Sequence, residues 1–454
     1  MKSTLIKTLI CYFFFTFCIN CLKVKAGTIT VSTVTALQSA INTSTAGTVI
    51  LVASNTYTNA SVTVLNSNIT IKAATSGSVI FNGSSSFTIS GSNNVLAGFQ
   101  FKGGDIGAGN IIEINGNSNT ITNCNFQSYG AHNYIHTNNG TALNIISYCN
   151  FESKPGVLNA GPAIQVSTSS TVINYTKIRY CSFINFLGAG GDFGNEAIRI
   201  GLSTEQNNIS GCIVEYCYFE NTGLGDSESI SVKSKMNLLR YNTQNNNPDA
   251  CFVFRSGNQN SAYGNYFINS GGIRVKEGHN HMIYNNYFQN GSATQGSLVL
   301  ENYSANPLDT IYIYHNTFYN PGPIKLGGAG SYPPTHVKIA NNIFYKTSSV
   351  ILTDINTNVG YYKNVYWGGA SLGRTFLTSE FMNVNPLLAL NAFNIFSLTS
   401  NSPCLNVATS SCPPLIDNIH LNDDPNLLLD IEGQARTSTN TLRDIGCDEF
   451  SSAA

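Results

Sequence analysis

One short motif recurs along most of the chain, and it restricts the folds that the chain can adopt. Most copies place a cysteine or an asparagine two positions before an aromatic residue, as in Cys124-Asn125-Phe126. Successive copies lie 21 to 36 residues apart. The first position is occupied in turn by Cys124, Cys149, Cys181, Cys217, Asn242, Asn265, Asn286, Asn316, Asn342 and Asn364. A repeat with this period indicates a solenoid in which each unit packs against its neighbours.

The motif also predicts how side chains are arranged inside the solenoid. Residues two apart on a strand share a face, so Cys124 and Phe126 point the same way. Stacking the coils at ~4.8 Å places cysteine over cysteine, asparagine over asparagine and phenylalanine over phenylalanine. We expect the asparagines to hydrogen-bond along the stack and the cysteines to act as buried, small apolar residues, although neighbours in one column lie close enough to oxidise. Cys404 and Cys412 are the better candidates for a disulfide.

The chain is therefore predicted to be all-β and to fold as a single right-handed parallel β-helix. Residues 27–366 are predicted to form this β-helix. Residues 33–42 are predicted to form a short helix that caps the N-terminal end of the stack, as a solenoid requires. Residues 367–454 break the repeat and contain the cluster Asp423-Asp424-Pro425. They are expected to form C-terminal coils and an irregular cap of the same domain.

The first 26 residues have the pattern of a secretory signal peptide. Lys2 and Lys7 supply positive charge, residues 5–18 are apolar, and Ala26 is a small residue before the predicted cleavage point. The alternatives are a retained anchor or a lipoprotein signal at Cys21. No other segment is long and apolar enough to span a membrane. The mature protein is expected to be secreted, either outside the cell or into a periplasm.

Charge is scarce in this chain. Charged residues make up 10% of the sequence, against about 25% in an average protein, and the formal net charge is −1. This composition gives no reason to expect nucleic acid or an anionic membrane as a partner, and no oligomer is indicated. Any column of charged residues on one face is therefore informative.

Such a column is found in four segments that align without gaps. They are residues 198–201, 230–233, 252–255 and 273–276. Their apolar residues alternate and are expected to face inward, so the intervening residues face outward. The outward residues are Arg199 and Gly201, then Lys233, then Arg255, then Arg274 and Lys276. Lys233, Arg255 and Lys276 lie 9, 10 and 10 residues before Asn242, Asn265 and Asn286.

An acidic and amide-bearing group precedes this basic strip. It consists of Asn195, Glu196, Asp226 and Glu228. Hard oxygen ligands of this kind suit Ca²⁺ better than a transition metal, and a basic strip on an extended face suits a polyanion. The alternative is a solvated face with incidental ion pairs. Because the charges concentrate in four of about ten coils, we favour a functional site.

These segments resemble the alginate lyase and chondroitinase B family, the sixth family of polysaccharide lyases. The resemblance is carried by residues 195–201, 228–234, 254–257, 264–267 and 272–288, and by the tail segments 430–434 and 444–449. It covers most of the mature chain and is most specific over residues 226–288. Two positions depart from the family pattern, because Ser256 replaces a histidine and Asp226 stands where glutamate is common.

The resemblance implies a reaction and assigns roles. In β-elimination a base removes the proton at C5 of a uronate and the 4-linked glycosidic bond breaks. Lys233 would be the general base and Arg255 the general acid. Asn195, with Glu196 as an alternative, would hold Ca²⁺ together with Asp226 and Glu228. The residues expected to bind flanking uronates are Arg199, Arg274, Lys276 and His281.

Several alternatives for the substrate and activity stay open at this stage. An acidic polysaccharide is expected, and alginate is favoured over dermatan sulfate because the basic positions are few for a sulfated chain. A pectate lyase, a hydrolase of the polygalacturonase type and a non-catalytic glycan-binding β-helix are the other hypotheses. The long coils between Cys149 and Cys217, including residues 188–191, are predicted to form a wall or lid beside the cleft.

Overall fold

The computed structural model describes residues 27–156, 161–191, 194–301, 308–327, 332–354, 358–411, 429–437 and 442–450. The predicted signal peptide, Cys412 and the cluster at residues 423–425 lie outside these ranges. Among the described residues, no helix is both long and apolar enough to cross a membrane.

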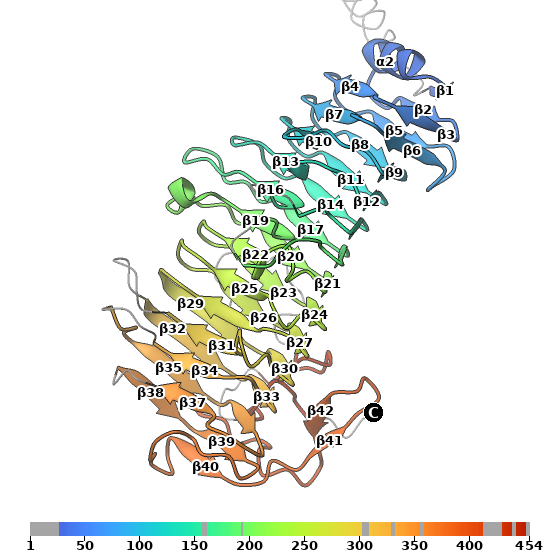
Figure 1. Cartoon of the computed structure of the whole chain (residues 1–454). Coiled ribbons are helices and arrows are strands. Elements are labelled where there is room, and N and C mark those ends of the chain that lie inside the picture. The colour runs from blue at the N-terminus through green and yellow to red at the C-terminus, as the bar shows by residue number, and fades with distance from the viewer. Residues whose placement is uncertain are drawn as a thin grey trace, which may run out of the picture.

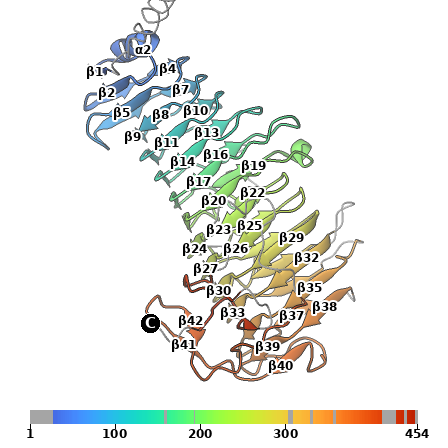
Figure 2. The ribbon, with the colours of Figure 1, turned by 180° about the vertical axis from the view of Figure 1, so that it is seen from behind.

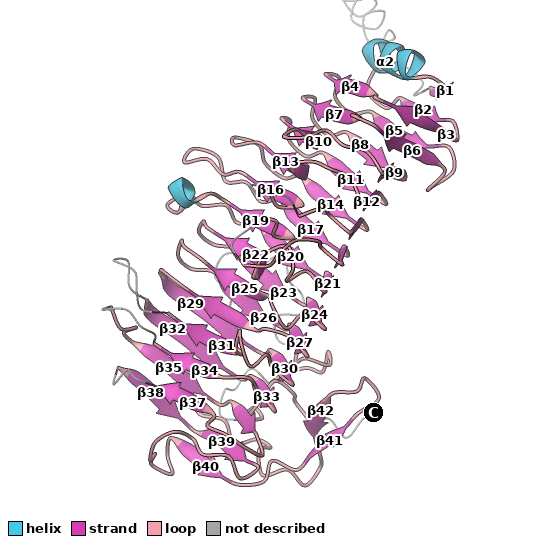
Figure 3. Ribbon diagram, viewed as in Figure 1, coloured by secondary structure: helices cyan, strands magenta, loops and turns pink. Residues whose placement is uncertain are grey.

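The chain winds through three long parallel sheets, which we name A, B and C. Each turn of the chain passes from sheet A to sheet B, then to sheet C, and returns to sheet A one coil further along (Figures 1 and 2). Each strand pairs in parallel with its equivalents in the coils before and after it. The prediction of an all-β parallel β-helix is confirmed. Strands make up nearly all of the regular structure, as Figure 3 shows.

Sheet A consists of β1 (Thr28–Val31), β2 (Val49–Val52), β5 (Thr70–Ala73), β8 (Val95–Ala97), β11 (Thr120–Thr122), β14 (Ile145–Ser147), β17 (Lys177–Arg179), β20 (Ile213–Glu215), β23 (Leu238–Arg240), β26 (Ser261–Tyr263), β29 (His279–Tyr284), β32 (Asp309–Tyr314), β35 (Val337–Ala340) and β38 (Val359–Tyr362). Sheet B consists of β3 (Asn55–Thr58), β6 (Val79–Asn82), β9 (Phe99–Lys102), β12 (Asn125–Gln127), β15 (Asn150–Glu152), β18 (Ser182–Ile184), β21 (Tyr218–Glu220), β24 (Thr243–Asn245), β27 (Tyr266–Ile268), β30 (Tyr287–Gln289), β33 (Thr317–Tyr319), β36 (Ile343–Tyr345), β39 (Asn364–Trp367) and β40 (Phe381–Asn383). Sheet C consists of β4 (Ser61–Val64), β7 (Ser86–Ile89), β10 (Asn110–Ile114), β13 (Asn133–Thr137), β16 (Ile164–Val166), β19 (Ile198–Ile200), β22 (Glu228–Val232), β25 (Cys251–Phe254), β28 (Ile273–Val275), β31 (Leu298–Leu300), β34 (Ile324–Leu326) and β37 (Leu352–Asp354).

The asparagine ladder forms as expected at the corner between sheets A and B. The side-chain oxygen of Asn265 accepts the backbone N–H of Asn242 at 3.0 Å and also its side-chain N–H at 3.0 Å. The same pattern continues through Asn286, Asn316, Asn342 and Asn364. Each asparagine thus satisfies a buried backbone group that the turn would otherwise leave unpaired.

The other two predicted stacks are also present. Cys124, Cys149, Cys181 and Cys217 are buried free thiols. The rings of Phe126, Phe151, Phe183 and Phe219 stack with centroids 4.8 to 4.9 Å apart. These columns fill the interior, so an open surface for chemistry must lie outside the coils.

The corner before each ladder residue has a left-handed backbone, which the repeat did not predict. Tyr148 and Lys363 both belong to one such series, with φ of 53° and 50°. Asparagine and glycine adopt this conformation easily, whereas tyrosine and lysine must be held there by the rest of the coil. The sharp corner therefore depends on the stacked ladder beside it.

A helix covers the N-terminal end of the stack, whereas part of the C-terminal segment packs against the side of sheet B, where Phe396 stacks on Tyr319. At the N-terminus, α2 (Val34–Thr43) covers the first coils, with Thr33 as its N-cap, which accepts the Ala36 N–H at 3.1 Å (Figure 1). This agrees with the predicted cap helix to within one residue. At the C-terminus, β40 adds one more strand to sheet B beyond residue 366, and β41 (Leu388–Leu390) pairs antiparallel with β42 (Phe396–Leu398). Cys404 is a buried free thiol.

Candidate active site

The basic column predicted from the sequence lies on sheet C, at the ends of four neighbouring strands. Ile200 of β19 pairs with Val232 of β22, and Val232 pairs with Phe254 of β25. The residues that follow these strands are therefore adjacent. The Lys233 N–H donates to the Ile200 carbonyl at 2.7 Å, and the Arg255 N–H donates to the Val232 carbonyl at 2.8 Å. Lys233 and Arg255 thus leave the backbone one coil apart, about 4.8 Å along the stack.

The Lys233 ammonium has surroundings that favour its neutral form. The side chain is partly exposed. Burial lowers its pKa, and the nearby Arg199 guanidinium lowers it further, whereas Glu196 and Glu228 oppose the shift and Arg255 adds to it. A lysine with a lowered pKa can act as a proton acceptor at a lower pH than free lysine.

Arg255 is held by the acidic group on the same sheet. Its Nη1 lies 2.6 Å from Oε1 of Glu228, and its side chain is one-third exposed, whereas that of Glu228 is buried. Sequence spacing predicted neither the pairing nor its orientation. The pairing fixes the guanidinium beside Lys233, with part of its surface exposed on the outer face of sheet C, which we call the groove.

Three side chains offer oxygen atoms to a hard cation. Asn195, Asp226 and Glu228 are all buried. Within the described part of the chain, neither Oδ1 of Asn195 nor Oε2 of Glu228 has a hydrogen-bond partner. The Nδ2 of Asn195 donates to the Leu187 carbonyl at 3.2 Å and more weakly to that of Pro155 at 3.4 Å. This orientation leaves the amide oxygen available as a ligand. Buried oxygens without partners are costly, and a bound cation would satisfy them.

Asp226 is a buried carboxyl group next to other carboxylates, so a nearby cation would stabilise its ionised form. Its two oxygens accept the backbone N–H groups of Glu228 at 3.0 Å and Gly194 at 2.9 Å. Burial raises the pKa of this carboxyl to about 7, and the carboxylates of Glu196 and Glu228 contribute to the rise. No group of three or more histidine, cysteine, aspartate and glutamate side chains among the described residues forms a metal-binding cluster. The candidate set is therefore one amide and two carboxylates, which fits Ca²⁺.

Glu196, the alternative ligand, is engaged elsewhere. Nε of Arg199 donates to its Oε1 at 2.9 Å, and Nη2 of Arg199 bonds to its Oε2. Lys154 is nearly fully buried near this pair. Burial lowers the pKa of its ammonium, and the opposing effect of the Glu196 carboxylate is smaller, so the pKa is about 7. Lys154 was not predicted from the sequence, because it follows a strand of sheet B and reaches this region only through the fold.

The predicted substrate-binding residues separate into two groups. Arg274 is partly exposed and contacts Gln295 and Glu301, the latter at 3.6 Å, and Lys276 is partly exposed beside Arg255. His281 lies elsewhere. It is fully buried and stacks on Phe254, its Nδ1 accepts the backbone N–H of Asn260 at 3.2 Å, and Nε2 meets the Glu277 carbonyl. The structure therefore does not bring His281 to the groove.

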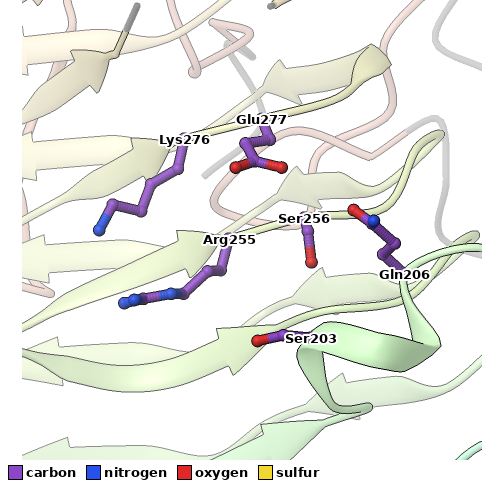
Figure 4. Close-up of a pocket in the computed structure, with 6 residues that line it drawn as sticks. All are labelled: Ser203, Gln206, Arg255, Ser256, Lys276 and Glu277. Carbon is purple, nitrogen blue, oxygen red and sulfur yellow. The ribbon is translucent and has the colours of Figure 1, made fainter. Parts of the chain in front are cut away.

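A cavity of about 300 Å³ opens next to Arg255. One side is formed by the short 3₁₀ helix η1 (Ser203–Glu205) and Gln206, which project from the stack beside β19 (Figure 3). Figure 4 shows the other side, where Arg255, Ser256, Lys276 and Glu277 line the same space. The predicted wall between Cys149 and Cys217 thus includes residues 203–206. Gly190 and Gly191 line a separate cavity of about 350 Å³.

Comparisons with known proteins show the family of the chain and support its fold. A family model described as Chondroitinase B matches residues 31–321. The alginate lyase AlyGC, of polysaccharide lyase family 6, superimposes with a TM-score of 0.75 at 21% identity, over 83% of this chain and 56% of that one. This chain thus spans little more than half the length of AlyGC.

Two further solved structures are similar over most of both chains. A mannuronic acid specific family 6 lyase from human gut microbiota has a TM-score of 0.68 at 21% identity, over 79% of this chain and 91% of that one. The alginate lyase AlyF-OU02, solved with a ligand named G6, has a TM-score of 0.67 at 18% identity, over 82% and 90%. No curated protein sequence matches the chain. At these identities the structures support the fold, and the family match carries the assignment.

Proposed function

Because this chain belongs to the chondroitinase B family of polysaccharide lyases, we propose that it cleaves an acidic uronate polysaccharide, with alginate as substrate, by β-elimination. The observation that carries this proposal is the placement of Lys233 and Arg255 one coil apart beside a buried group of oxygens without partners. A base, a cation and a metal-binding group on one open face are what elimination beside a carboxylate requires.

In this reaction Lys233 would accept the proton from C5 of the bound uronate. The lowered pKa of its ammonium increases the fraction of neutral amine that can do so. Arg255 stays protonated, so its role is to stabilise the negative charge on the leaving glycosidic oxygen, directly or through water. Its ion pair with Glu228 holds the guanidinium in place for this role.

We propose Ca²⁺ as the cofactor of this site, where its charge would neutralise the substrate carboxylate and stabilise the charge developing beside C5. Asn195, Asp226 and Glu228 would hold it. Arg199 would keep Glu196 neutralised next to these ligands, and the partly exposed Arg274 and Lys276 would contact flanking uronates.

Alginate is proposed ahead of dermatan sulfate for two reasons. Besides Arg255, the cavity is lined by one further cation, Lys276, and the carboxylate of Glu277 offsets its charge. The cavity therefore has little net positive charge with which to bind a sulfate group. The solved relatives AlyGC and AlyF-OU02 are described as alginate lyases. We also propose that the protein is secreted after removal of residues 1–26, because that segment has the charge and apolar pattern of an export signal.

The test is a substrate panel of polymannuronate, polyguluronate, pectate and dermatan sulfate. Each is incubated with wild type and Lys233→Ala, with and without a chelator, and the ultraviolet absorbance of unsaturated uronate is followed. We expect absorbance to rise with the alginate polymers, and to be lost with the chelator or the variant. New reducing ends without that absorbance would identify a hydrolase, and binding without any product would identify a glycan-binding protein.

A further inference from the structure

Three side chains on successive coils form a hydrogen-bonded line on sheet C, on the N-terminal side of the lyase site. Ser167 follows β16, His136 lies on β13 and Glu113 lies on β10. Oγ of Ser167 is 2.9 Å from Nε2 of His136, and Nδ1 of His136 is 3.1 Å from Oε1 of Glu113. A hydroxyl, an imidazole and a carboxylate joined in this order form the arrangement that activates a serine nucleophile.

The strand register places this line in the same groove as the lyase residues. Glu113 pairs with His136, and the next two residues of that column are Gln165 and Arg199. Ser167 lies in the neighbouring column, which continues through Gly201 to Lys233. Two coils separate Ser167 from Lys233, a rise of about 10 Å. A polysaccharide that lies along sheet C at Lys233 would therefore also pass Ser167.

The carboxylate that orients the imidazole is itself held by two amides. Nδ2 of Asn110 donates to Oε2 of Glu113 at 2.6 Å, and Nδ2 of Asn138 donates to Oε1. Burial raises the pKa of Glu113, but the hydrogen bonds from His136 and these amides outweigh it, so the pKa lies below its ordinary value. An ionised Glu113 accepts the proton on Nδ1 of His136, which leaves Nε2 free to accept the Ser167 proton.

Gln165 offers an amide N–H two residues before the nucleophile. Gln165 is 5% exposed and precedes Ser167 by two residues, on the same face of β16. Its Nε2 has no hydrogen-bond partner among the described residues. A buried amide N–H without a partner is costly, and the oxygen of a bound ester would satisfy it. Ser167 is itself only 8% exposed, and the side chains of His136 and Glu113 are 18% and 23% exposed, so a substrate would approach the line from the side of His136.

We propose that Ser167 and His136, positioned by Glu113, form a second catalytic site that hydrolyses an acyl ester on a sugar hydroxyl of the polysaccharide. The choice of polysaccharide as the ester's carrier rests on the proposed lyase function, whereas the hydrolytic chemistry rests on the three side chains. Removal of an acyl group two coils from Lys233 would expose the free hydroxyls of a uronate in the same groove before or after elimination.

The proposed steps balance with water as the only co-reactant. Oγ of Ser167 attacks the ester carbonyl while Nε2 of His136 takes the hydroxyl proton, and Gln165 donates to the resulting oxyanion. The carbon–oxygen bond to the sugar breaks, and His136 returns the proton to the sugar oxygen, leaving an acyl-serine. Water then attacks the acyl carbon with its proton passing to His136, and the acid is released as Ser167 regains its proton.

The first experiment needs no variant. The full chain is treated with a fluorophosphonate, which labels activated serines, and the adduct is located by peptide mass spectrometry. In parallel, O-acetylated polymannuronate is supplied as substrate, and released acetate and unsaturated uronate are quantified in the same sample. We expect labelling at Ser167 and release of acetate. No adduct at Ser167, together with acetate no higher than in a buffer blank, would overturn the proposal.

The second experiment uses Ser167→Ala with Ser169→Ala as its matched control. Ser169 is a partly exposed serine on the same loop, and its hydroxyl contacts that of Thr171. Ser167→Ala should reduce acetate release by about 10³-fold or more, with an unchanged circular dichroism spectrum, and the control should match wild type. Equal release by Ser167→Ala and wild type would refute the assignment. Glu113→Gln should lower kcat for acetate release with little change in KM, which a purely structural role would not do.

The two products separate the two functions. Unsaturated uronate without acetate would overturn the second site and leave the lyase proposal intact. Acetate without unsaturated uronate would contradict the lyase proposal and support the second site.

Discussion

Arg255 and Glu228 form an ion pair across neighbouring coils of sheet C, with Nη1 and Oε1 2.6 Å apart, and the second carboxylate oxygen of Glu228 is left without a partner among the described residues. One carboxylate thus serves two neighbours: it fixes the guanidinium and presents an oxygen to a cation. Because both functions depend on the same side chain, the arginine and the metal group are expected to be coupled.

Glu228→Gln tests this coupling. The amide keeps the shape of the side chain but removes the charge that binds Arg255 and a cation. We expect lyase activity to fall about 100-fold or more and calcium affinity to fall with it, measured by product absorbance and by calorimetric titration. Glu220→Gln is the matched control, since Glu220 accepts from Tyr218 on sheet B, away from the groove. A Glu228→Gln variant with wild-type activity and calcium affinity would contradict the coupling.

Lys233→Ala tests the general base. Loss of a base that transfers a proton in the transition state lowers the rate by about 10²- to 10⁴-fold, whereas stability should change little because the side chain is partly exposed. Lys235→Ala is the control: Lys235 is partly exposed, two residues away, and its backbone hydrogen bonds remain in the variant. Steady-state rates and melting temperatures are compared for both. Equal losses in the two variants would argue for a general charge effect on substrate binding.

The pH dependence of the rate provides a separate test through Arg199. Burial and Arg199 lower the pKa of Lys233. Because the base must be neutral, kcat/KM should rise with pH, and this rising limb of the pH profile should lie below the ordinary lysine pKa of about 10.4. Arg199→Gln removes one lowering charge and frees Glu196, so the limb should move to higher pH. Arg374→Gln, an exposed arginine near the C-terminal end, should leave the limb in place. A shift to lower pH in Arg199→Gln would be the opposite of what these charges require.

The fold and the basic column were predictable from the sequence because the coils that carry them are short and regular. Lys233, Arg255 and Lys276 lie at nearly constant distances before their ladder asparagines, so the inner ladder aligns the outer column. The line of Ser167, His136 and Glu113 was not predictable in this way. The equivalent positions Glu113, His136 and Gln165 lie 11, 13 and 16 residues before Cys124, Cys149 and Cys181, because loops of different length intervene.

His281 shows a second limit of the pattern. Its strand, β29, begins at His279, earlier in the coil than β26 does. His281 lies five residues before Asn286, as the buried Asn260 lies five residues before Asn265, a spacing that the prediction did not use. Once the strand includes residue 281, the period of two places His281 on the same inward face as Ile283. Charge and position near the basic column therefore suggested a surface residue that the fold buries.

The asparagine ladder should make a large contribution to stability, which Asn242→Ala tests. This change leaves the Cys217 N–H and the Val214 carbonyl without their side-chain partners. Each buried group left unpaired costs about 1–3 kcal/mol. Asn245→Ala is the matched control on the same coil, since that side chain is partly exposed and donates to the Tyr218 hydroxyl. Denaturant unfolding should show a much larger loss of unfolding free energy for Asn242→Ala, and similar losses would mean that the ladder adds little.

Burial of His281 predicts how stability depends on pH. Burial lowers its pKa to about 4 in the folded protein, and the neighbouring His279 lowers it further, against about 6.5 in the unfolded chain. The unfolded state therefore binds the extra proton first as pH falls, and the folded state loses stability between about pH 6.5 and 4, by about 1.4 kcal/mol per pH unit from this group.

Gln does not titrate, so the difference in unfolding free energy between wild type and His281→Gln should shrink as pH falls through this window. Urea unfolding at pH 7.5 and pH 5 measures it. His279→Gln replaces an exposed histidine and should show a much smaller change. A pH-independent difference for His281→Gln would mean that this histidine is not held neutral by its burial.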